Sequence, residues 1–199
     1  METNIDLYSE YTFDTLVVGS SNQFAYAASK AVAHNLGTLY NPMIIYGNVG
    51  LGKTHLLHSI GHEVHSAGLK VTYDTFENFF NELRKNITAN TMEYFRDKYR
   101  DTDLLLLDDI QFIANKTVLQ EEFFNTFNDL KRLNKQVVLT SDRHPKELIV
   151  EERIKNRLEG ELIVEILIPD LETKKEIIRK KCLRNRIIFD EDMVSYIAT

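Results

Sequence analysis

Several features that mark particular classes of protein are scarce or missing in this sequence. One of its 199 residues is a cysteine, Cys182, so no disulfide framework can form and a reducing compartment is expected. The longest apolar runs have the length of a strand and fall far short of the ~20 residues that a membrane helix needs. The first residues are acidic and polar, unlike a secretion signal. These absences predict a cytoplasmic protein without a transmembrane segment.

Positive charge is also in deficit. Lysine and arginine together number 24 against 30 aspartates and glutamates, which gives a formal net charge of -6. A protein whose whole surface binds duplex DNA would carry the opposite balance, so that class is disfavoured, although a local basic stripe remains open. The hydrophobic fraction of 43% is typical of a globular protein, and the length is sufficient for one sizeable core.

Short apolar runs alternate with helical patterns along most of the chain. Strands are expected at 42–46, 70–73, 103–107, 136–140 and 162–167. Helices are expected after the cap residues 20–22, after the glycine loop described below, and at 75–86, 91–99 and 119–133. The first helix carries as its apolar residues Phe24, Ala27, Ala31 and Val32. The alternation predicts an α/β fold with a parallel sheet covered on both faces, followed from residue 169 by helices alone.

The first expected strand ends at a glycine-rich loop, GNVGLGKT, which covers residues 47–54. The loop fits the pattern G-x-x-x-x-G-K-[ST], with a strand before it and a helix after it as the pattern requires. Glycines such as Gly50 and Gly52 let backbone N–H groups turn toward phosphate oxygens, and the following helix presents its positive end to the same anion. Lys53 is expected to contact the β- and γ-phosphates, and the Thr54 hydroxyl to ligate Mg²⁺.

The loop therefore predicts a nucleotide site, whose further candidate residues are Asn48, Val49, Leu51 and His55. The alternative is a glycine turn that binds nothing, which the combination of motif and context disfavours. A dinucleotide-binding fold is a weak rival, because the loop does not have the pattern G-x-G-x-x-G.

A second acidic element follows the apolar run 104–107, where Asp108 and Asp109 are adjacent. Asp108, at the end of a buried strand, is expected to hold Mg²⁺, and Asp109 to orient or deprotonate the attacking water. The alternative is that two aspartates merely end a strand. The separation from Thr54, by one strand and two helices, favours the catalytic interpretation.

Four histidines recur at spacings of three, four and three on the helix after the loop, at His55, His58, His62 and His65. This spacing places them on one face of the helix. Such a row suggests either a metal site or a polar helix face. Because the sequence places no cysteine or carboxylate beside them, we expect the polar face.

Longer motifs surround these elements: YNPMIIYGNVGLGKTHLLHSIG, LLLLDDIQFIANK, QEEFFNTFNDL and KQVVLTSDRHPKEL. With them, the chain from about residue 11 to residue 199 resembles the AAA+ ATPase domain of the bacterial chromosomal replication initiator family, DnaA. The resemblance implies a P-loop NTPase with a parallel five-stranded sheet, in the order 5-1-4-3-2, between helices. Residues 1–168 would form the nucleotide-binding α/β subdomain and residues 169–199 the start of a small helical lid. The chain is then expected to be a fragment or a minimal relative.

The resemblance also assigns residues by position. Asp142 falls at the sensor 1 position near the γ-phosphate, and Val17, Val18 and Gly19 lie where the family's N-terminal segment packs on adenine. Arg157 matches the arginine finger, which acts on ATP held by a neighbouring subunit. The catalytic set that the resemblance implies is Asp108, Asp109, Asp142 and Arg157.

The implied activity is weak ATP hydrolysis that switches the protein between ATP and ADP states, with Mg²⁺ as the metal. The implied partners are other copies of the chain in an ATP-dependent head-to-tail oligomer, single-stranded DNA at the unwound origin, and the replicative helicase or initiation regulators. Residues 76–99 resemble the family's helical insertion, which faces single-stranded DNA. The DNA candidates are Arg84, Lys85 and Lys116.

Other residues of this insertion are weaker candidates. Arg96, Lys98 and Arg100 could follow phosphates, and Tyr94 or Tyr99 could meet bases. Acidic residues interleave with them, so a solvated amphipathic helix pair remains the alternative.

Three functions remain open at this point. The first is an ATP-switched initiator module, the second a helicase loader or regulatory protein related to DnaA, and the third a nucleotide kinase. The kinase lacks an acceptor-binding signature and leaves Arg157 unexplained. The motifs DDIQF and QEEFFNTFNDL favour the initiator over the loader.

Overall fold

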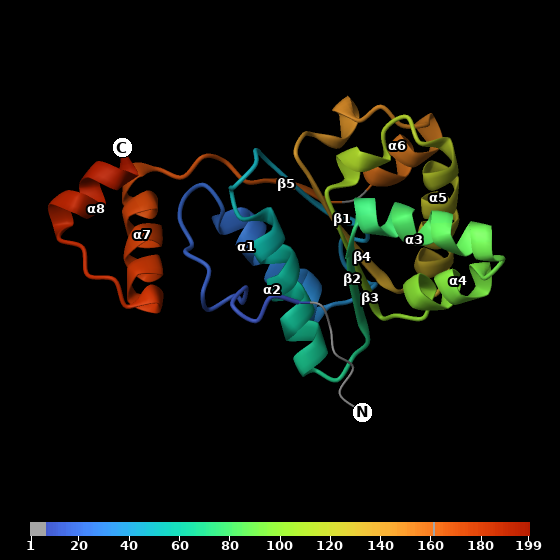
Figure 1. Ribbon diagram of the computed structural model, residues 1–199, viewed down its shortest axis with the longest axis horizontal. Helices are drawn as coiled ribbons and strands as arrows, with labels where there is room; N and C mark the ends of the chain where they lie inside the picture. The colour runs from blue at the N-terminus through green and yellow to red at the C-terminus, as the bar shows by residue number, and fades with distance from the viewer. Residues whose placement is uncertain (1–6, 161) are drawn as a thin grey trace.

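A five-stranded parallel sheet forms the centre of the computed structural model, which describes residues 7–160 and 162–199 (Figure 1). The strands are β1 (Met43–Tyr46), β2 (Val71–Thr75), β3 (Leu104–Asp108), β4 (Gln136–Ser141) and β5 (Leu162–Glu165). Their order across the sheet is β2-β3-β4-β1-β5, and every neighbouring pair is parallel. This order confirms the 5-1-4-3-2 arrangement that the sequence motifs implied.

Helices cover both faces of the sheet (Figure 1). One face carries α1 (Gln23–His34) and α2 (Lys53–Ser66). The other carries α3 (Phe76–Ala89), α4 (Met92–Arg100), α5 (Thr117–Arg132) and α6 (Glu152–Leu158), with the short 3-10 helices η1 (Ile110–Ile113) and η2 (Pro145–Glu147) in the connections. Within the described residues, no helix combines the length and apolar composition needed to cross a membrane.

The continuous apolar run of β3 supplies both cores. Successive side chains of a strand point to opposite faces. Leu104 and Leu106 accordingly pack with α1 and α2, whereas Leu105 and Leu107 pack with the core of α3 to α6. All four are fully buried. A run with no polar residue is therefore what a central strand of this sheet requires.

Helix α1 differs from expectation in its buried face. Its buried residues are Ala25, Ala28, Ser29 and Val32. Phe24, by contrast, is 64% exposed. Small side chains let one backbone approach another closely, so here the helix buries alanine and serine rather than its largest apolar residue. The apolar residues that the sequence pattern singled out thus include one member of the buried face, Val32.

The last two helices, α7 (Leu171–Asn185) and α8 (Glu191–Ala198), lie beyond α1 at one end of the molecule (Figure 1). Asp170 caps α7 by accepting from the Thr173 N–H at 2.8 Å, and it also accepts from Ser20 Oγ at 2.8 Å. Lys180 Nζ donates to the Asp14 and Leu16 carbonyls at 3.1 and 3.2 Å. The pair is thereby attached to the segment that precedes α1.

Candidate nucleotide-binding site

The glycine-rich loop connects the carboxyl end of β1 to the first residue of α2. Gly50 and Gly52 have φ of +82° and +96°, a region of the backbone map that residues with a Cβ rarely adopt. No side chain caps the start of α2. The first N–H groups of a helix have no partner within the helix, so this end of α2 offers donors and a positive dipole to an anion.

Lys53, the first residue of α2, is buried, with 7% of its surface exposed. Its Nζ donates to the carbonyls of Gly47 at 2.7 Å and Asn48 at 2.9 Å. Among the described residues, no carboxylate lies within ion-pair distance of this ammonium. A buried positive charge without a counter-ion, beside an uncapped helix start, fits an anionic ligand such as a phosphate.

The phosphate loop and the acidic pair Asp108–Asp109 are in direct contact. Thr54 Oγ1 donates to Asp108 Oδ2 at 2.7 Å, and the Thr140 hydroxyl donates to the other oxygen of the same carboxylate. Asp108 is buried at the end of β3, and this burial raises its pKa, while the two hydroxyls and Lys53 act in the opposite direction. A carboxylate and a hydroxyl in contact form the kind of oxygen pair that Mg²⁺ accepts.

Asp109 is held in a left-handed conformation, with φ of +63°. Its N–H donates to Thr140 Oγ1 at 2.9 Å. Gln111 Nε2 donates to Asp109 Oδ1 at 2.8 Å, and Gln111 Oε1 accepts from the Asp142 N–H at 3.1 Å. The Gln111 amide thus joins the ends of β3 and β4. Gln111 and Thr140 were not predicted from the sequence as site residues, although Gln111 belongs to the DDIQF motif.

The Asp142 side chain is paired with its neighbour. Arg143 donates through Nε and Nη2 to the two carboxylate oxygens of Asp142, at 2.6 and 2.9 Å. This pairing holds the pKa of Asp142 below its usual range. Both residues line a cavity of about 730 Å³ together with Gly47 and Asn48 of the phosphate loop. The residue predicted as sensor 1 therefore faces the same space as the loop.

The segment predicted to pack on adenine lies between α1 and α7. Asn22 holds it, because its Nδ2 donates to the Val17 carbonyl and its Oδ1 accepts from the Gly19 N–H, both at 2.9 Å. A Cβ on Gly19 would lie 2.2 Å from Oγ1 of Thr173 in α7. Val18 remains 45% exposed. The Val18 side chain thus stays accessible although its segment is held by Asn22 and packs against α7.

The two arginines of α6 have different surroundings. Arg153 Nε pairs with Glu151 Oε2 at 2.6 Å, and its guanidinium lies 4.7 Å from the ring centre of Phe124. Arg157 is exposed and has no hydrogen-bond or ion-pair partner in the part of the chain that the structure describes. Figure 1 places α6, which carries Arg157, on the face of the sheet opposite α2.

The histidine row of α2, predicted to be a polar helix face, makes polar contacts but is largely covered by another segment. His58 is fully buried, and His55 and His62 contact the backbone of residues 8–12. Of the four, His65 is the one classed as exposed. The reason is that an N-terminal segment more than forty residues away folds over this face. Among the described residues, no group of three or more histidine, cysteine, aspartate or glutamate side chains is placed to hold a metal ion.

Some basic side chains of the α3–α4 pair are exposed, whereas others form ion pairs with acidic residues. Arg84 and Lys85 of α3 are exposed. Arg100 of α4 instead pairs with Glu122 at 2.6 Å and with Asp129. Tyr99 is fully buried and donates to Asp74 Oδ2 at 2.7 Å, so the expectation that it could meet a base is wrong. The side chain is committed to the interior of the helix pair.

Lys116, the third DNA candidate, precedes α5. Its Nζ donates to the Phe112 carbonyl and lies 3.7 Å from the centre of the Phe112 ring. The ammonium also lies 6.0 Å from the ring centre of Phe80 in α3. Lys116 is therefore held over two aromatic side chains rather than extended into solvent.

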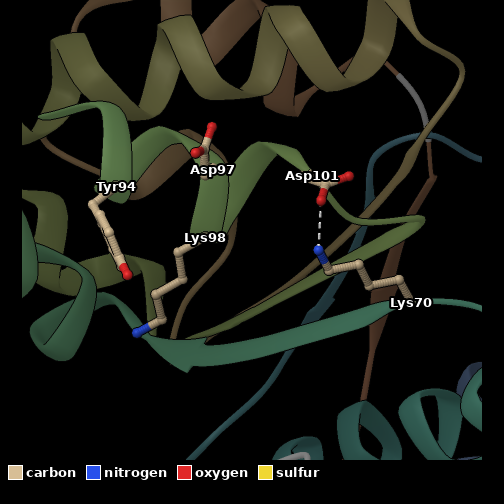
Figure 2. A pocket seen from close by; sticks show the side chains of 5 residues that line it. All are labelled: Lys70, Tyr94, Asp97, Lys98 and Asp101. Carbon is tan, nitrogen blue, oxygen red and sulfur yellow. Dashed lines mark hydrogen bonds and ion pairs between the residues drawn. The ribbon is translucent and has the colours of Figure 1, made fainter. Parts of the chain in front are cut away.

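A second cavity, of about 250 Å³, is lined by Tyr94, Asp97 and Lys98 of α4 and by Lys70 and Asp101 (Figure 2). The Lys70–Asp101 ion pair, at 2.7 Å, is drawn at one side of it. Lys70 directly precedes β2, so this cavity lies at the amino end of that strand. The phosphate loop follows the carboxyl end of β1 in the same parallel sheet. The cavity is therefore separate from the candidate nucleotide site.

The sheet order, the phosphate loop after β1 and the acidic pair after β3 together define a P-loop NTPase of the AAA+ class. Residues 7–165 match the family model described as the bacterial DnaA ATPase domain. The chain belongs to this family, as its motifs indicated.

Individual proteins of this family are similar to the chain in sequence and in structure. The chain is 55% identical over 194 residues to the chromosomal replication initiator protein DnaA of Nautilia profundicola, a match that covers 97% of this chain and 44% of that protein. The crystal structure of domain III of Thermotoga maritima DnaA has a TM-score of 0.93 at 43% identity, covering 96% of this chain and 81% of that one. The chain thus spans less than half the length of the full relative.

A further similar structure is the replication initiator DnaA bound to AMPPCP and single-stranded DNA, with a TM-score of 0.91 at 40% identity, covering 97% of this chain and 60% of that one. The DnaC helicase loader is similar with a TM-score of 0.71 at 15% identity, covering 80% of this chain and all of that one. At that identity the likeness concerns the fold alone.

Proposed function

We propose that this chain is the ATP-binding module of a bacterial replication initiator, acting in the cytoplasm and switching between ATP-bound and ADP-bound states. The observation that carries the proposal is the contact between Thr54 and Asp108 beside the buried ammonium of Lys53. That contact joins the phosphate loop to the acid at the end of β3. A related DnaA binds the ATP analogue AMPPCP together with single-stranded DNA, which supports the same ligands here.

The residues fit a nucleotide with Mg²⁺. Lys53 and the first N–H groups of α2 would bind the phosphates, and Thr54 and Asp108 would hold the metal through their oxygens. A bound Mg²⁺ would supply charge neutralisation to the phosphates. The remaining loop candidates, Asn48, Val49, Leu51 and His55, lie around these groups, and the segment Val17–Gly19 would contact the base.

The same arrangement supports slow hydrolysis. Asp109 would orient or deprotonate the attacking water, because Gln111 and Thr140 hold it at the edge of the site without neutralising it. Asp142 would act beside it, near the terminal phosphate. The proposal is a weak ATPase in which hydrolysis ends the ATP-bound state.

Assembly would use the exposed guanidinium of Arg157, which has no partner among the residues that the structure describes. An arginine that reaches the terminal phosphate of a neighbouring subunit's ATP would make copies of the chain associate head to tail while ATP is bound. Residues 169–199 would form the start of the lid over the nucleotide, attached to residues 1–168 through the Asp170 and Lys180 contacts. Contacts with the replicative helicase or initiation regulators remain a prediction without an assigned surface.

Single-stranded DNA at the unwound origin would follow the side of α3 that carries Arg84 and Lys85, with Lys116 nearby. Arg84 and Lys116 both lie over the Phe80 ring, at 5.8 and 6.0 Å from its centre, which gathers positive charge and aromatic surface in one place. This grouping favours the initiator over a nucleotide kinase, which has no use for it.

Calorimetric titration with ATP and ADP, in the presence and absence of Mg²⁺, tests the proposal. Lys53→Ala should abolish measurable binding of both nucleotides and leave the thermal unfolding temperature close to that of the parent, since Lys53 contacts carbonyls of its own loop. Lys70→Ala, at the opposite edge of the sheet, is the matched control and should bind normally. Unchanged affinity in Lys53→Ala would reject the site.

A further inference from the structure

Residues 8–15, here called the N-terminal strap, are fastened to the histidine row of α2. The Tyr8 N–H donates to His58 Nδ1 at 3.0 Å, and the Tyr8 carbonyl lies 2.9 Å from His62 Nε2. At the other end of the strap, His55 Nε2 lies 2.9 Å from the Thr12 carbonyl. Tyr8 also stacks on the His58 ring, with ring centres 5.0 Å apart. The strap therefore follows α2 along the face that the histidines occupy.

The His55 contact fixes the tautomer of that ring. A carbonyl oxygen only accepts, so Nε2 of His55 carries the proton that is donated to Thr12. The same N–H points to Thr15 Oγ1 at 3.1 Å. The Thr15 hydroxyl donates to the Glu10 carbonyl at 2.7 Å and accepts from the Thr12 N–H at 3.1 Å. His55 thus contributes to the hydrogen bonds of this turn from α2, while Lys180 of α7 reaches the Asp14 carbonyl from another side.

Packing holds the His55 ring in this orientation. Tyr11 stacks on it with ring centres 4.8 Å apart and an angle of 17° between the planes. Burial lowers the pKa of His55, which keeps the ring neutral near pH 7, with Nε2 as its one donor. Facing charges on neighbouring elements are Glu10 of the strap and Lys180 and Arg184 of α7.

The contact between His55 and the strap links the phosphate loop to the segment Val17–Gly19. It directly follows Thr54 of the phosphate loop, whereas Thr15 lies two residues before Val17. Between them, Leu16 approaches the loop: its Cδ1 lies 3.9 Å from the point that a Cβ on Gly52 would occupy. One side chain on the phosphate-binding helix therefore holds the turn from which the proposed base-binding segment emerges.

We propose that His55 is a positioning residue for the nucleobase: it sets the place of the segment Val17–Gly19 relative to the phosphate loop. This inference rests on the proposed function, because it assumes that this segment meets the base. The side chain itself is committed to the strap, so its contribution to binding is indirect. Phosphates held by the loop do not depend on the strap, whereas the base does.

The test compares ATP with inorganic tripolyphosphate, which has the phosphates but no base. His55→Ala should weaken ATP binding about tenfold, the effect of losing one buried hydrogen bond and its packing, and leave the tripolyphosphate affinity within about twofold. His55→Gln should recover most of the ATP affinity, because its amide N–H₂ can donate to Thr12. His62→Ala removes a similar contact at the far end of the strap and should leave both affinities unchanged.

Thr15→Val supplies a second variant that does not alter α2, and it should weaken ATP binding in the same selective way. Equal losses for ATP and tripolyphosphate in His55→Ala, in protein that still unfolds cooperatively, would mean that His55 supports the loop and would overturn the inference. Unchanged affinity for both would overturn it as well. A parent chain that binds tripolyphosphate but not ATP, or neither, would overturn the proposed function first.

Discussion

Lys53 and Asp108 are both buried ionisable residues, and at the residue scale their surroundings explain what they can bind. Within the described part of the chain, the Lys53 ammonium has only carbonyl oxygens as hydrogen-bond partners, and the Asp108 carboxylate has only hydroxyl donors. Neither charge is neutralised by the other in an ion pair among the described residues. A phosphate beside Lys53 and a cation beside Asp108 would each offset the cost of a buried charge.

Asp109→Asn should separate hydrolysis from binding. Asparagine tolerates the φ of +63° found at this position and still accepts from Gln111, so the site should keep its shape. It cannot take a proton from water, and we expect turnover to fall ~100-fold or more while the ATP dissociation constant changes by less than about threefold. Steady-state hydrolysis and calorimetry check this, with Asp101→Asn as a remote control. Equal losses of both quantities would indicate a metal-binding or structural role.

His58 predicts a pH dependence of stability. Burial lowers its pKa from 6.5 to about 4, with His62 and His55 acting in the same direction and Glu10 against them. Between these pH values the unfolded chain binds a proton that the folded chain does not, so this contribution is complete above about pH 6.5 and is lost as the pH falls toward 4. The loss should reach roughly 2–3 kcal/mol.

Urea unfolding across this pH range measures the effect. His58→Asn keeps an acceptor for the Tyr8 N–H but does not titrate, so its unfolding free energy should fall less steeply with acid than that of the parent. His65→Asn, at an exposed position, should keep the slope of the parent. Parallel slopes for the parent and His58→Asn would contradict the assignment to His58.

At the element scale, the α3–α4 pair is tied to α5 by one arginine. Arg100 of α4 reaches both Glu122 and Asp129 of α5, and Glu122 is nearly buried. The cations of α4 are thereby used within the protein, whereas Arg84 and Lys85 of α3 face outward. Although both helices are rich in charge, they are expected to serve different purposes, with α4 fixing the pair and α3 presenting it to DNA.

Arg100→Ala should therefore affect mainly the stability of the protein, whereas Lys85→Ala should affect mainly the binding of DNA. The first leaves Glu122 without its closest cation and should lower the free energy of unfolding by about 2 kcal/mol, since partial exposure of Arg100 reduces the full cost of a broken buried pair. The second should change stability by less than ~0.5 kcal/mol yet weaken single-stranded DNA binding. Chemical unfolding and fluorescence anisotropy with an oligonucleotide measure both. Stability loss in Lys85→Ala alone would reverse these roles.

At the scale of the whole molecule, α6, which carries Arg157, lies on the face of the sheet opposite α2, which begins with Lys53 and Thr54 of the candidate site. A residue placed in this way contributes nothing to nucleotide binding within one subunit, and it can contribute only where a second copy presents its nucleotide. The exposed guanidinium, without a partner among the described residues, is consistent with such a use. Single-stranded DNA binding that depends on assembly would then depend on Arg157 as well.

Arg157→Ala should leave the ATP affinity of the isolated subunit nearly unchanged and strongly reduce ATP-dependent assembly. Losing one partner of a desolvated charge pair typically costs ~2–5 kcal/mol per interface, enough to abolish weak association at micromolar protein. Chemical crosslinking on a single-stranded oligonucleotide, with ATP or ADP, is the measurement. Arg132→Ala is the control, because Arg132 is also an exposed arginine but lies on α5. If Arg157→Ala forms crosslinked oligomers as large as those of the parent in the presence of ATP, Arg157 is an ordinary surface residue.

Much of the fold and of the candidate site follows from the sequence by itself. The phosphate loop is local, because the glycines, Lys53 and Thr54 are contiguous and their backbone conformations do not depend on distant segments. The run 104–107 predicts a doubly covered strand, since no other environment accepts four consecutive leucines there. The order of the strands came from the family's motifs rather than from periodicity, and the structure confirms it.

Tertiary structure alone decided which polar side chains became buried and which cations stayed free. Histidine spacing on α2 predicts a polar face, but it does not predict that the strap, far away in sequence, covers this face and buries His58. The sequence left Tyr99 of α4 available to meet a base, but in the structure its hydroxyl donates to Asp74 of β2. Gln111 joins Asp109 to Asp142 only because β3 and β4 end side by side. A local pattern fixes the chemistry of a side chain, whereas its partners depend on which distant segments the fold brings against it.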